Sequence, residues 1–269
     1  MTRAALLVVL AATPALGQEW YIPKRQTLLS RGSGELGMRL QQSANNDGLL
    51  DTLRLEAIPH VRYAPLRRLE LYTELPFSYV EREDVVAFNL IKNDTTGIGD
   101  AFAQVGLEGF SGEDWKILYN LDGTFPSGKS PYKHRVAIGN GHFAAALGQT
   151  MMKVIDPVVL FMHLGYQHVF ARRTPAGWVS PGRSIRYRFG AALALNPRVQ
   201  TTLHVTGEGV KTTRVDGRPV AGTSGTLLRF GWGLDWRIGD RWRWHFDSAL
   251  GMTKNTPDAT LSTGWSWRF

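Results

Sequence analysis

The last stretch of the chain most constrains the fold, because apolar and polar side chains alternate strictly from Asp258 to the terminal Phe269. This period of two indicates a β-strand rather than a helix. One face ends in two tryptophans and a phenylalanine, which suits lipid better than water, and the other face is small or polar. The first face carries Ala259, Leu261, Thr263, Trp265, Trp267 and Phe269; the second carries Thr260, Ser262, Gly264, Ser266 and Arg268.

The same alternation recurs along the chain and predicts an all-β fold, an antiparallel transmembrane β-barrel of about 12 strands closed by the strand that ends in Phe269. A bilayer-crossing strand needs about 9–11 tilted residues. A soluble sandwich of similar strands is the alternative, but such apolar outer faces would aggregate in water. The expected strands cover 35–41, 51–63, 68–79, 97–110, 115–125, 136–152, 158–167, 184–195, 199–205, 226–237, 242–250 and 258–269, with a polar loop over 81–96 and unclear boundaries within 136–152.

The N-terminus has the pattern of a secretory signal peptide over residues 1–17. Arg3 supplies the positive charge, residues 4–12 form a short apolar core, and small residues precede Gln18. The core is shorter than the roughly 20 residues that a spanning helix needs. We therefore expect a signal peptide over 1–17, a periplasmic lead-in over 18–34 and a barrel over 35–269, exported to the outer membrane of a Gram-negative bacterium.

Composition excludes some chemistry. The 269 residues include no cysteine, which rules out disulfides and cysteine-bound metals. No cofactor and no metal site is expected. The net charge is +8, from 31 Lys and Arg against 23 Asp and Glu. Basic residues in the long connections suit the phosphates of lipopolysaccharide, and the sequence gives no reason to expect nucleic-acid binding in an exported barrel.

The predicted connections alternate in length, as in barrels with short periplasmic turns and longer extracellular loops. Short turns fall near Pro65, Gly112, Asp156, Pro197 and Gly239, and long connections near Gly48, Val85, Lys129, Pro175 and Gly217. Aromatic residues gather at the short-turn end, as interfacial rings do. The predicted aromatic girdle consists of Trp115, Trp236, Trp242, Trp267 and Phe269.

Charged and polar side chains on the opposite faces of the strands are predicted to line the lumen. The lumen-facing candidates are Asp100, Asp122, His163, Arg186, Arg188, Arg229, Asp235, Arg243, His245 and Asp247. A barrel of about 12 strands is intermediate between side-chain-filled barrels and wide aqueous porins. Two alternatives therefore stay open: the charges pair and plug the lumen, or they line a selective path.

Motifs give little support for catalysis. Residues 123–130 match the spacing of a phosphate-binding P-loop, but Pro131 follows at once and no helical pattern succeeds it. None of the seven histidines is followed two residues later by serine, the pattern of outer-membrane lipid hydrolases. His245 and Asp247 share one lumenal row, which favours a polar network over an active site. No catalytic residue is assigned.

Several patches together resemble a known family. They are residues 74–77 (Glu-Leu-Pro-Phe), 97–100 (Gly-Ile-Gly-Asp), 125–128 (Phe-Pro-Ser-Gly) and 256–258 (Thr-Pro-Asp). Their order and spacing are similar to those of outer-membrane proteins named for the meta-pathway of phenol degradation, over about residues 49–269. Ser127 stands where the family pattern has threonine. The resemblance implies a barrel that helps aromatic or other hydrophobic compounds cross the outer membrane, and it implies no catalytic residues.

The predicted function is a channel that passively admits small solutes, including aromatic or hydrophobic compounds. The predicted partners are membrane lipid, lipopolysaccharide, a small-molecule solute and the outer-membrane barrel assembly machinery, which reads a terminal aromatic strand. A barrel enzyme acting on lipid or lipopolysaccharide, and a closed structural or adhesion barrel, are the alternatives.

Overall fold

The computed structural model describes residues 28–46, 50–86, 89–134, 136–175, 177–254 and 256–269. The predicted signal peptide and most of the predicted lead-in lie outside these residues. Within them, no helix is long and apolar enough to cross a membrane. The strands are β1 (Gly34–Asn46), β2 (Leu50–Leu66), β3 (Leu69–Glu74), β4 (Phe77–Val86), β5 (Asn89–Ile98), β6 (Ala101–Ser111), β7 (Trp115–Phe125), β8 (Ala144–Ile155), β9 (Val158–Val169), β10 (Arg172–Thr174), β11 (Gly177–Ser180), β12 (Ser184–Asn196), β13 (Val199–Val210), β14 (Arg214–Val215), β15 (Arg218–Pro219), β16 (Gly225–Arg237), β17 (Trp242–Gly251) and β18 (Ala259–Arg268).

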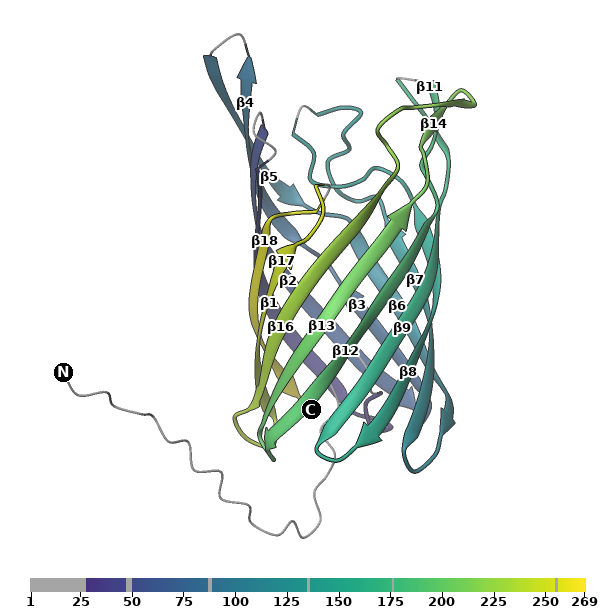
Figure 1. The fold of residues 1–269 in the computed structure, drawn as a ribbon, viewed down its shortest axis with the longest axis vertical. Helices are drawn as coiled ribbons and strands as arrows, with labels where there is room; N and C mark the ends of the chain where they lie inside the picture. The colour runs from purple at the N-terminus through teal and green to yellow at the C-terminus, as the bar shows by residue number, and fades with distance from the viewer. Residues whose placement is uncertain (1–27, 47–49, 87–88, 135, 176, 255) are drawn as a thin grey trace, which may run out of the picture.

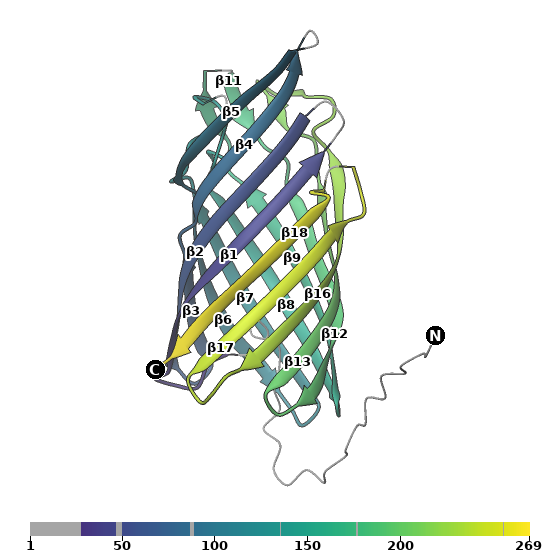
Figure 2. The ribbon, with the colours of Figure 1, turned by 90° about the vertical axis from the view of Figure 1, so that its left-hand side faces the viewer.

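The main sheet closes on itself as an antiparallel barrel (Figures 1 and 2). Its order is β1-β18-β17-β16-β13-β12-β9-β8-β7-β6-β3-β2, and β1 pairs with both β18 and β2. Closure satisfies the backbone hydrogen bonds of every wall strand without an exposed edge, as a membrane requires. Among the described residues the ring has twelve strands, which confirms the predicted fold.

The two ends of the barrel chain meet at the seam. The amide of Gly34 donates to the carbonyl of Phe269 at 3.0 Å, and the amide of Phe269 donates to the carbonyl of Gly34 at 3.0 Å. The terminal ring lies so close to Gly34 that a Cβ added there would fall 2.2 Å from it. The predicted last strand therefore closes the barrel, and a glycine at its partner position makes room for the final aromatic ring.

Residues 81–96 were predicted as a polar loop, but 81–86 and 89–96 instead belong to the paired strands β4 and β5, which rise beyond the rim (Figure 1). β4 continues the line of β3, and β5 continues into β6, with breaks at residues 75–76 and 99–100. Pro76 lacks an amide hydrogen and cannot extend the ladder. Gly99 donates to the carbonyl of Pro76 at 2.7 Å and so holds the two breaks together. The many charged residues of this segment led to the prediction of a loop. They do not alternate with apolar residues, because both faces of this hairpin have polar surroundings.

Side chains sort by face around the wall. The outward positions carry large apolar groups that are about half exposed, and the inward positions carry most of the buried polar ones. This is the pattern of a wall with lipid outside and a polar lumen inside. Outward examples are Leu107, Tyr119, Leu164, Phe189, Leu203, Phe230 and Leu261; inward examples are Arg62, Glu70, Thr150, Gln200, Thr202, His204 and Ser266.

Candidate functional site: the barrel lumen

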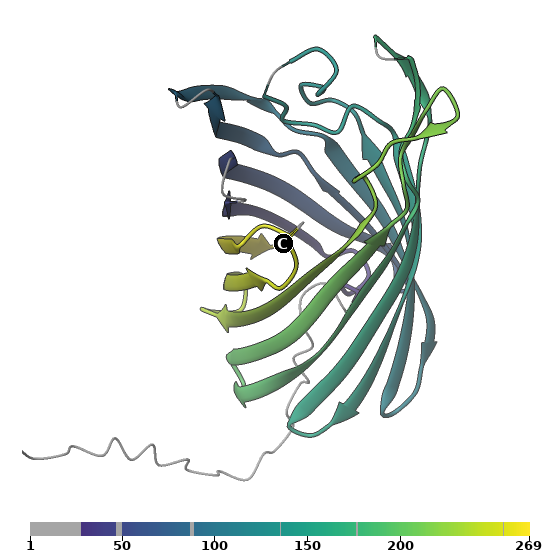
Figure 3. The same ribbon diagram turned by 45° about the horizontal axis from the view of Figure 1, so that its top comes forward.

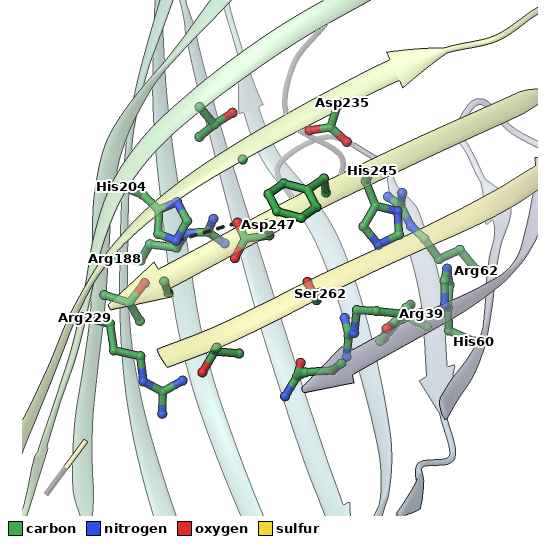
Figure 4. A pocket seen from close by; sticks show the side chains of 18 residues that line it. Arg39, His60, Arg62, Arg188, His204, Arg229, Asp235, His245, Asp247 and Ser262 are labelled. Atoms are coloured by element: carbon green, nitrogen blue, oxygen red, sulfur yellow. Dashed lines mark ion pairs between the residues drawn. The ribbon is translucent and has the colours of Figure 1, made fainter. Parts of the chain in front are cut away.

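The lumen contains two neighbouring cavities. The first, of about 340 Å³, lies against β1, β2, β13 and β16–β18, and we call it the polar chamber (Figure 4). The second, of about 220 Å³, lies against β3, β6–β9 and β12, and we call it the aromatic chamber. The two cavities share Arg62, Tyr72 and Arg188 as lining residues, so they adjoin in the middle of the lumen.

One row of paired residues crosses the wall of the polar chamber toward its extracellular side. Arg188 on β12 pairs with Thr206 on β13, and Thr206 pairs with Arg229 on β16. We call these three residues the arginine row. Arg188 also lies over the ring of Phe161 at 5.6 Å. Arg229 lines the polar chamber, and its guanidinium has no hydrogen bond or ion pair to any described residue.

Below the arginine row, β13 presents a ladder of buried polar side chains, Gln200, Thr202 and His204, which are 1%, 5% and 6% exposed. Both amide atoms of Gln200, Oγ1 of Thr202 and Nδ1 of His204 have no hydrogen-bond partner among the described residues. Buried polar atoms without partners each cost about 1–3 kcal/mol.

The flanks of this ladder are small. Gly231 and Gly233 on β16 stand beside His204 and Thr202. A Cβ at Gly231 would fall 2.4 Å from Nε2 of His204, so only glycine lets this ring lie flat against the wall. Nε2 of His204 also lies 4.0 Å from Oδ2 of Asp247. Thr202, His204 and Gly233 are among the residues that line the polar chamber.

The opposite wall, on β1–β3, carries paired charges instead. Nε and Nη2 of Arg62 donate to the two carboxylate oxygens of Glu70 at 3.0 and 2.9 Å. Arg39 pairs with Glu74 at 3.1 Å, and His60 lies 3.9 Å from Glu35. The amide of Leu29 donates to Glu70 at 2.8 Å. This network fixes the described start of the chain against the inner wall.

The aromatic chamber is less polar. Its lining includes Leu28, Tyr72, Phe102 and Leu118, and the rings of Tyr72 and Phe102 meet edge to face with centroids 6.0 Å apart. Beyond it, Leu118 joins Met152, Val159, Phe161 and Ala192 in a buried apolar cluster that fills part of the lumen. The aromatic chamber therefore offers an apolar surface beside the polar one.

The extracellular end is covered by residues 126–143, between β7 and β8, which we call the mouth loop (Figure 3). Its Val136 and Ile138 pack against the inward-facing Val80 of β4. Asp100 was predicted to line the lumen, but its carboxylate accepts hydrogen bonds from the amides of Gly128 and Asn140 at 3.0 and 2.6 Å. The reason is its place at the break between β5 and β6, where no strand orients it inward.

Ser127 completes this attachment. Its hydroxyl donates to the carbonyl of Gly99 at 2.8 Å and accepts from the amide of Ala101 at 2.9 Å. The patches at residues 97–100 and 125–128 are thus two halves of one contact. Among the described residues no helix follows residues 123–130, so the P-loop spacing here marks the end of a strand and the start of the mouth loop.

The mouth loop is also tied to the next connection through His142. Tyr132 donates its hydroxyl to Nε2 of His142 at 2.7 Å, and Nδ1 donates to the carbonyl of Phe170 at 3.0 Å. Burial, and then the charge of Arg172, lower the pKa of His142 from its ordinary value of 6.5, against the opposing effect of the Phe170 bond. Burial likewise raises the pKa of Tyr132. The neutral imidazole is therefore the form that fits this loop.

The other predicted lumen residues are divided between the two cavities and their surroundings. Arg188, Arg229, Asp235, His245 and Asp247 line the polar chamber, and His163 lines the aromatic chamber, where Thr150 bonds its Nδ1 at 2.9 Å. Asp122 accepts from the side-chain amides of Gln104 and Asn120. Arg186 pairs with Glu208 at 3.4 Å, and Arg243 shares the lumenal row of His245 and Asp247 on β17.

The predicted girdle residues lie near the ends of strands that adjoin the short turns. Trp115 and Trp242 begin β7 and β17, Trp236 is near the end of β16, and Phe269 follows β18. These four are between 43% and 54% exposed. Trp267 packs against Phe269 with ring centroids 5.4 Å apart.

Sequence reasoning missed some lining residues. Arg39, His60 and Arg62 were not among the candidates, and neither were Thr202 and His204. The signal for the first three was present as inward positions of two neighbouring strands, but pairing β1 with β2 was needed to see that they converge. For the β13 ladder, the signal is that glycines occupy the paired positions of β16. This signal can be seen only once the pairing register of β13 and β16 is known.

A wider hollow of about 790 Å³ lies where the β4–β5 hairpin meets β1, β2 and β18. Leu40, Leu55, Phe77, Ile98 and Leu261, all outward-facing, are among its lining residues and are 41–48% exposed. This hollow opens toward the lipid side, so the lumenal cavities are the candidate solute site.

A closed barrel with an apolar outer wall and a polar interior defines an outer-membrane β-barrel protein. Residues 59–269 match the family described as "Putative MetA-pathway of phenol degradation", and the chain belongs to this family. The resemblance seen in the sequence is thereby confirmed.

Solved structures share the fold. The COG4313 outer membrane channel from Pseudomonas putida F1 aligns with a TM-score of 0.77 at 13% identity, over 93% of this chain and all of that one. The NanC porin aligns with a TM-score of 0.55 at 10% identity, over 86% and 98% of the two chains. The translocator domain of the autotransporter NalP from Neisseria meningitidis aligns at 0.54 and 13%, over 91% of each.

Proposed function

We propose that this protein is a passive channel of the outer membrane for small solutes. The observation that carries the proposal is the pair of adjoining lumenal cavities inside a closed barrel. Cavities of about 340 and 220 Å³ suit small molecules rather than polymers or folded chains. The similarity of fold to proteins called a channel and a porin supports the same conclusion.

The route through the lumen is narrow. Leu28 and Leu29 lie against the inner wall, and the mouth loop lies over the opposite end. Solute passage therefore depends on movement of at least one of these segments. This restriction favours selective passage of single small molecules over the free diffusion of a wide porin.

An enzyme is less well supported. A lumenal hydrolase needs a nucleophile, a base and an orienting group within mutual hydrogen-bond reach. His245 and Asp247 line the same chamber, but the sequence offers neither the His-x-Ser pattern of outer-membrane lipid hydrolases nor another nucleophile motif beside them. A closed adhesion barrel is also less well supported, because a protein that acts only through its loops has no need of ordered cavities in its lumen.

Planar-bilayer recording of the full-length, refolded protein tests the proposal. We expect small, steady single-channel steps in potassium chloride from protein that also shows the gel shift of a folded barrel on unboiled samples. Folded protein that yields no steps, even after the mouth loop is released by Asp100→Ala, would contradict a channel.

A further inference from the structure

We propose that the lumen holds a binding site for aromatic carboxylates, with the carboxylate at the arginine row and the ring in the aromatic chamber. This inference rests on the proposed function in that it names the solute class of the same lumen. Its basis is the placement of an arginine that pairs with no described residue, a threonine hydroxyl beside it and an aromatic cavity within one connected space.

The first step concerns charge. Arg62 and Arg39 are held by Glu70 and Glu74 on the opposite wall, so their charges are already balanced. Arg229 has no such partner among the described residues and faces the polar chamber (Figure 4). An arginine offers a planar set of donors that matches a carboxylate, and a partly buried arginine without a counterion favours an anion beside it.

The protein's own carboxylates in this chamber stand further along the lumen. On β16, Asp235 comes six residues after Arg229, and Asp247 on β17 pairs with Gly233 rather than with the arginine row. A strand advances about 3.3 Å per residue, so these acids lie about 13–20 Å further along their strands. A solute arriving from the extracellular end meets the arginine row before it meets either acid.

The second step concerns hydrogen bonds. The hydroxyl of Thr206 lies between the two arginines of the row, and His204 and Thr202 follow below it on the same face of β13. Thr202 and His204 border the polar chamber, but Oγ1 of Thr202 and Nδ1 of His204 are closed off from it. Thr206 also lines the chamber, and its hydroxyl can donate a hydrogen bond to a carboxylate oxygen or to a water that bridges to it.

The third step concerns the rest of the solute. Arg188 and Tyr72 line both cavities, so a molecule bound at the arginine row extends directly into the aromatic chamber. There Tyr72, Phe102 and Leu118 present ring and aliphatic surface. Aromatic rings favour edge-to-face and offset packing against each other. A purely aliphatic acid would leave this surface empty, and an uncharged aromatic alcohol would leave Arg229 unpaired.

Calorimetric titration of the full-length protein in lipid nanodiscs tests the site with three probes: sodium benzoate, sodium acetate and benzyl alcohol. We expect benzoate to bind most tightly. Arg229→Gln should weaken benzoate about tenfold or more, since it removes a charge-assisted pair, and should leave benzyl alcohol unchanged. Phe102→Ala should weaken benzoate and benzyl alcohol but not acetate.

Arg237→Gln is the matched control, because Arg237 lies on the same face of β16 but bonds the carbonyl of Pro197 at the short-turn end. Each variant must show the gel shift of a folded barrel. Equal binding of benzoate and benzyl alcohol, no effect of Arg229→Gln, or no binding of any probe would overturn the inference. If the protein conducts but does not discriminate between the probes, the proposed channel stands and this binding site is wrong. If the protein binds benzoate but does not conduct, the binding site stands and the proposed channel is wrong.

Discussion

The two walls of the polar chamber use buried polar groups in opposite ways. On β1–β3, Arg62 and Glu70 satisfy each other with two hydrogen bonds. On β13, Gln200, Thr202 and His204 are equally buried, yet their polar atoms lack partners among the described residues. On the first wall, the polar groups bond to each other and stabilise the fold. On the second wall these polar atoms are closed off from the chamber and have no bond to a described residue, so the two walls of one lumen differ in how their buried polar groups are satisfied.

The largest effect should come from breaking the paired wall. Glu70→Ala removes the carboxylate that accepts two hydrogen bonds from Arg62, which is 5% exposed, and leaves it with Glu35 at 4.0 Å. A buried charge that loses its partner costs about 3–5 kcal/mol. Unfolding by guanidinium in detergent micelles, followed by tryptophan fluorescence, measures the free energy of unfolding. Gln200→Leu is the matched change on the other wall, with an expected cost below about 1 kcal/mol because no described bond is lost. Equal losses would erase the distinction between the walls.

A second test compares the two faces of β13 itself. Leu203 is 50% exposed on the outer face, next to the buried inward His204. Leu203→Arg should cost about 2–4 kcal/mol of unfolding free energy if the residue lies near the middle of the bilayer. Leu203→Met, which keeps the surface apolar, should cost far less. Equal stabilities of the two variants in lipid vesicles would mean that this face does not contact lipid.

Releasing the mouth loop should have a smaller effect on stability and a clear one on the lumen. Asp100→Ala removes the acceptor for two loop amides, each bond to a charged group being worth about 1.5–3 kcal/mol. We expect faster trypsin cleavage at Lys129 and Lys133 and a higher mean conductance. Asp240→Ala, in a short turn at the other end, serves as the control. Unchanged cleavage would show that Asp100 does not hold the loop.

The smallest expected effect is on pH dependence. The lowered pKa of His142 means that its neutral form stabilises the loop above the ordinary value of 6.5, and this contribution falls away as the pH drops below it. Protonated Nε2 can no longer accept from Tyr132. Conductance should therefore rise between neutral and mildly acidic pH, and His142→Gln should remove most of that change. If conductance still rises with falling pH in His142→Gln, a group other than His142 causes the rise.

More of the fold than of the site could be predicted from the sequence. Alternation fixes strands wherever lipid and lumen impose opposite chemistry, so the final strand and the number of strands in the ring followed from the sequence. The β4–β5 hairpin was not predicted, because polar residues stand on both of its faces. Glu81 bonds Tyr79 and pairs with Lys92 on one face, and Arg82 stands opposite Asn93 on the other. Arg229 was predicted as lumenal, but its lack of a partner depends on the register of strands far apart in the sequence. No pattern along one strand contains that information.

Efflux of radiolabelled terephthalate from proteoliposomes at neutral pH tests the account most directly, because an aromatic dicarboxylate is almost wholly ionised there and crosses lipid slowly by itself. The account predicts faster efflux than from protein-free vesicles, slower efflux with Arg229→Gln, and no change with Arg237→Gln. Efflux equal to that of protein-free vesicles, from protein shown to be folded, would contradict it.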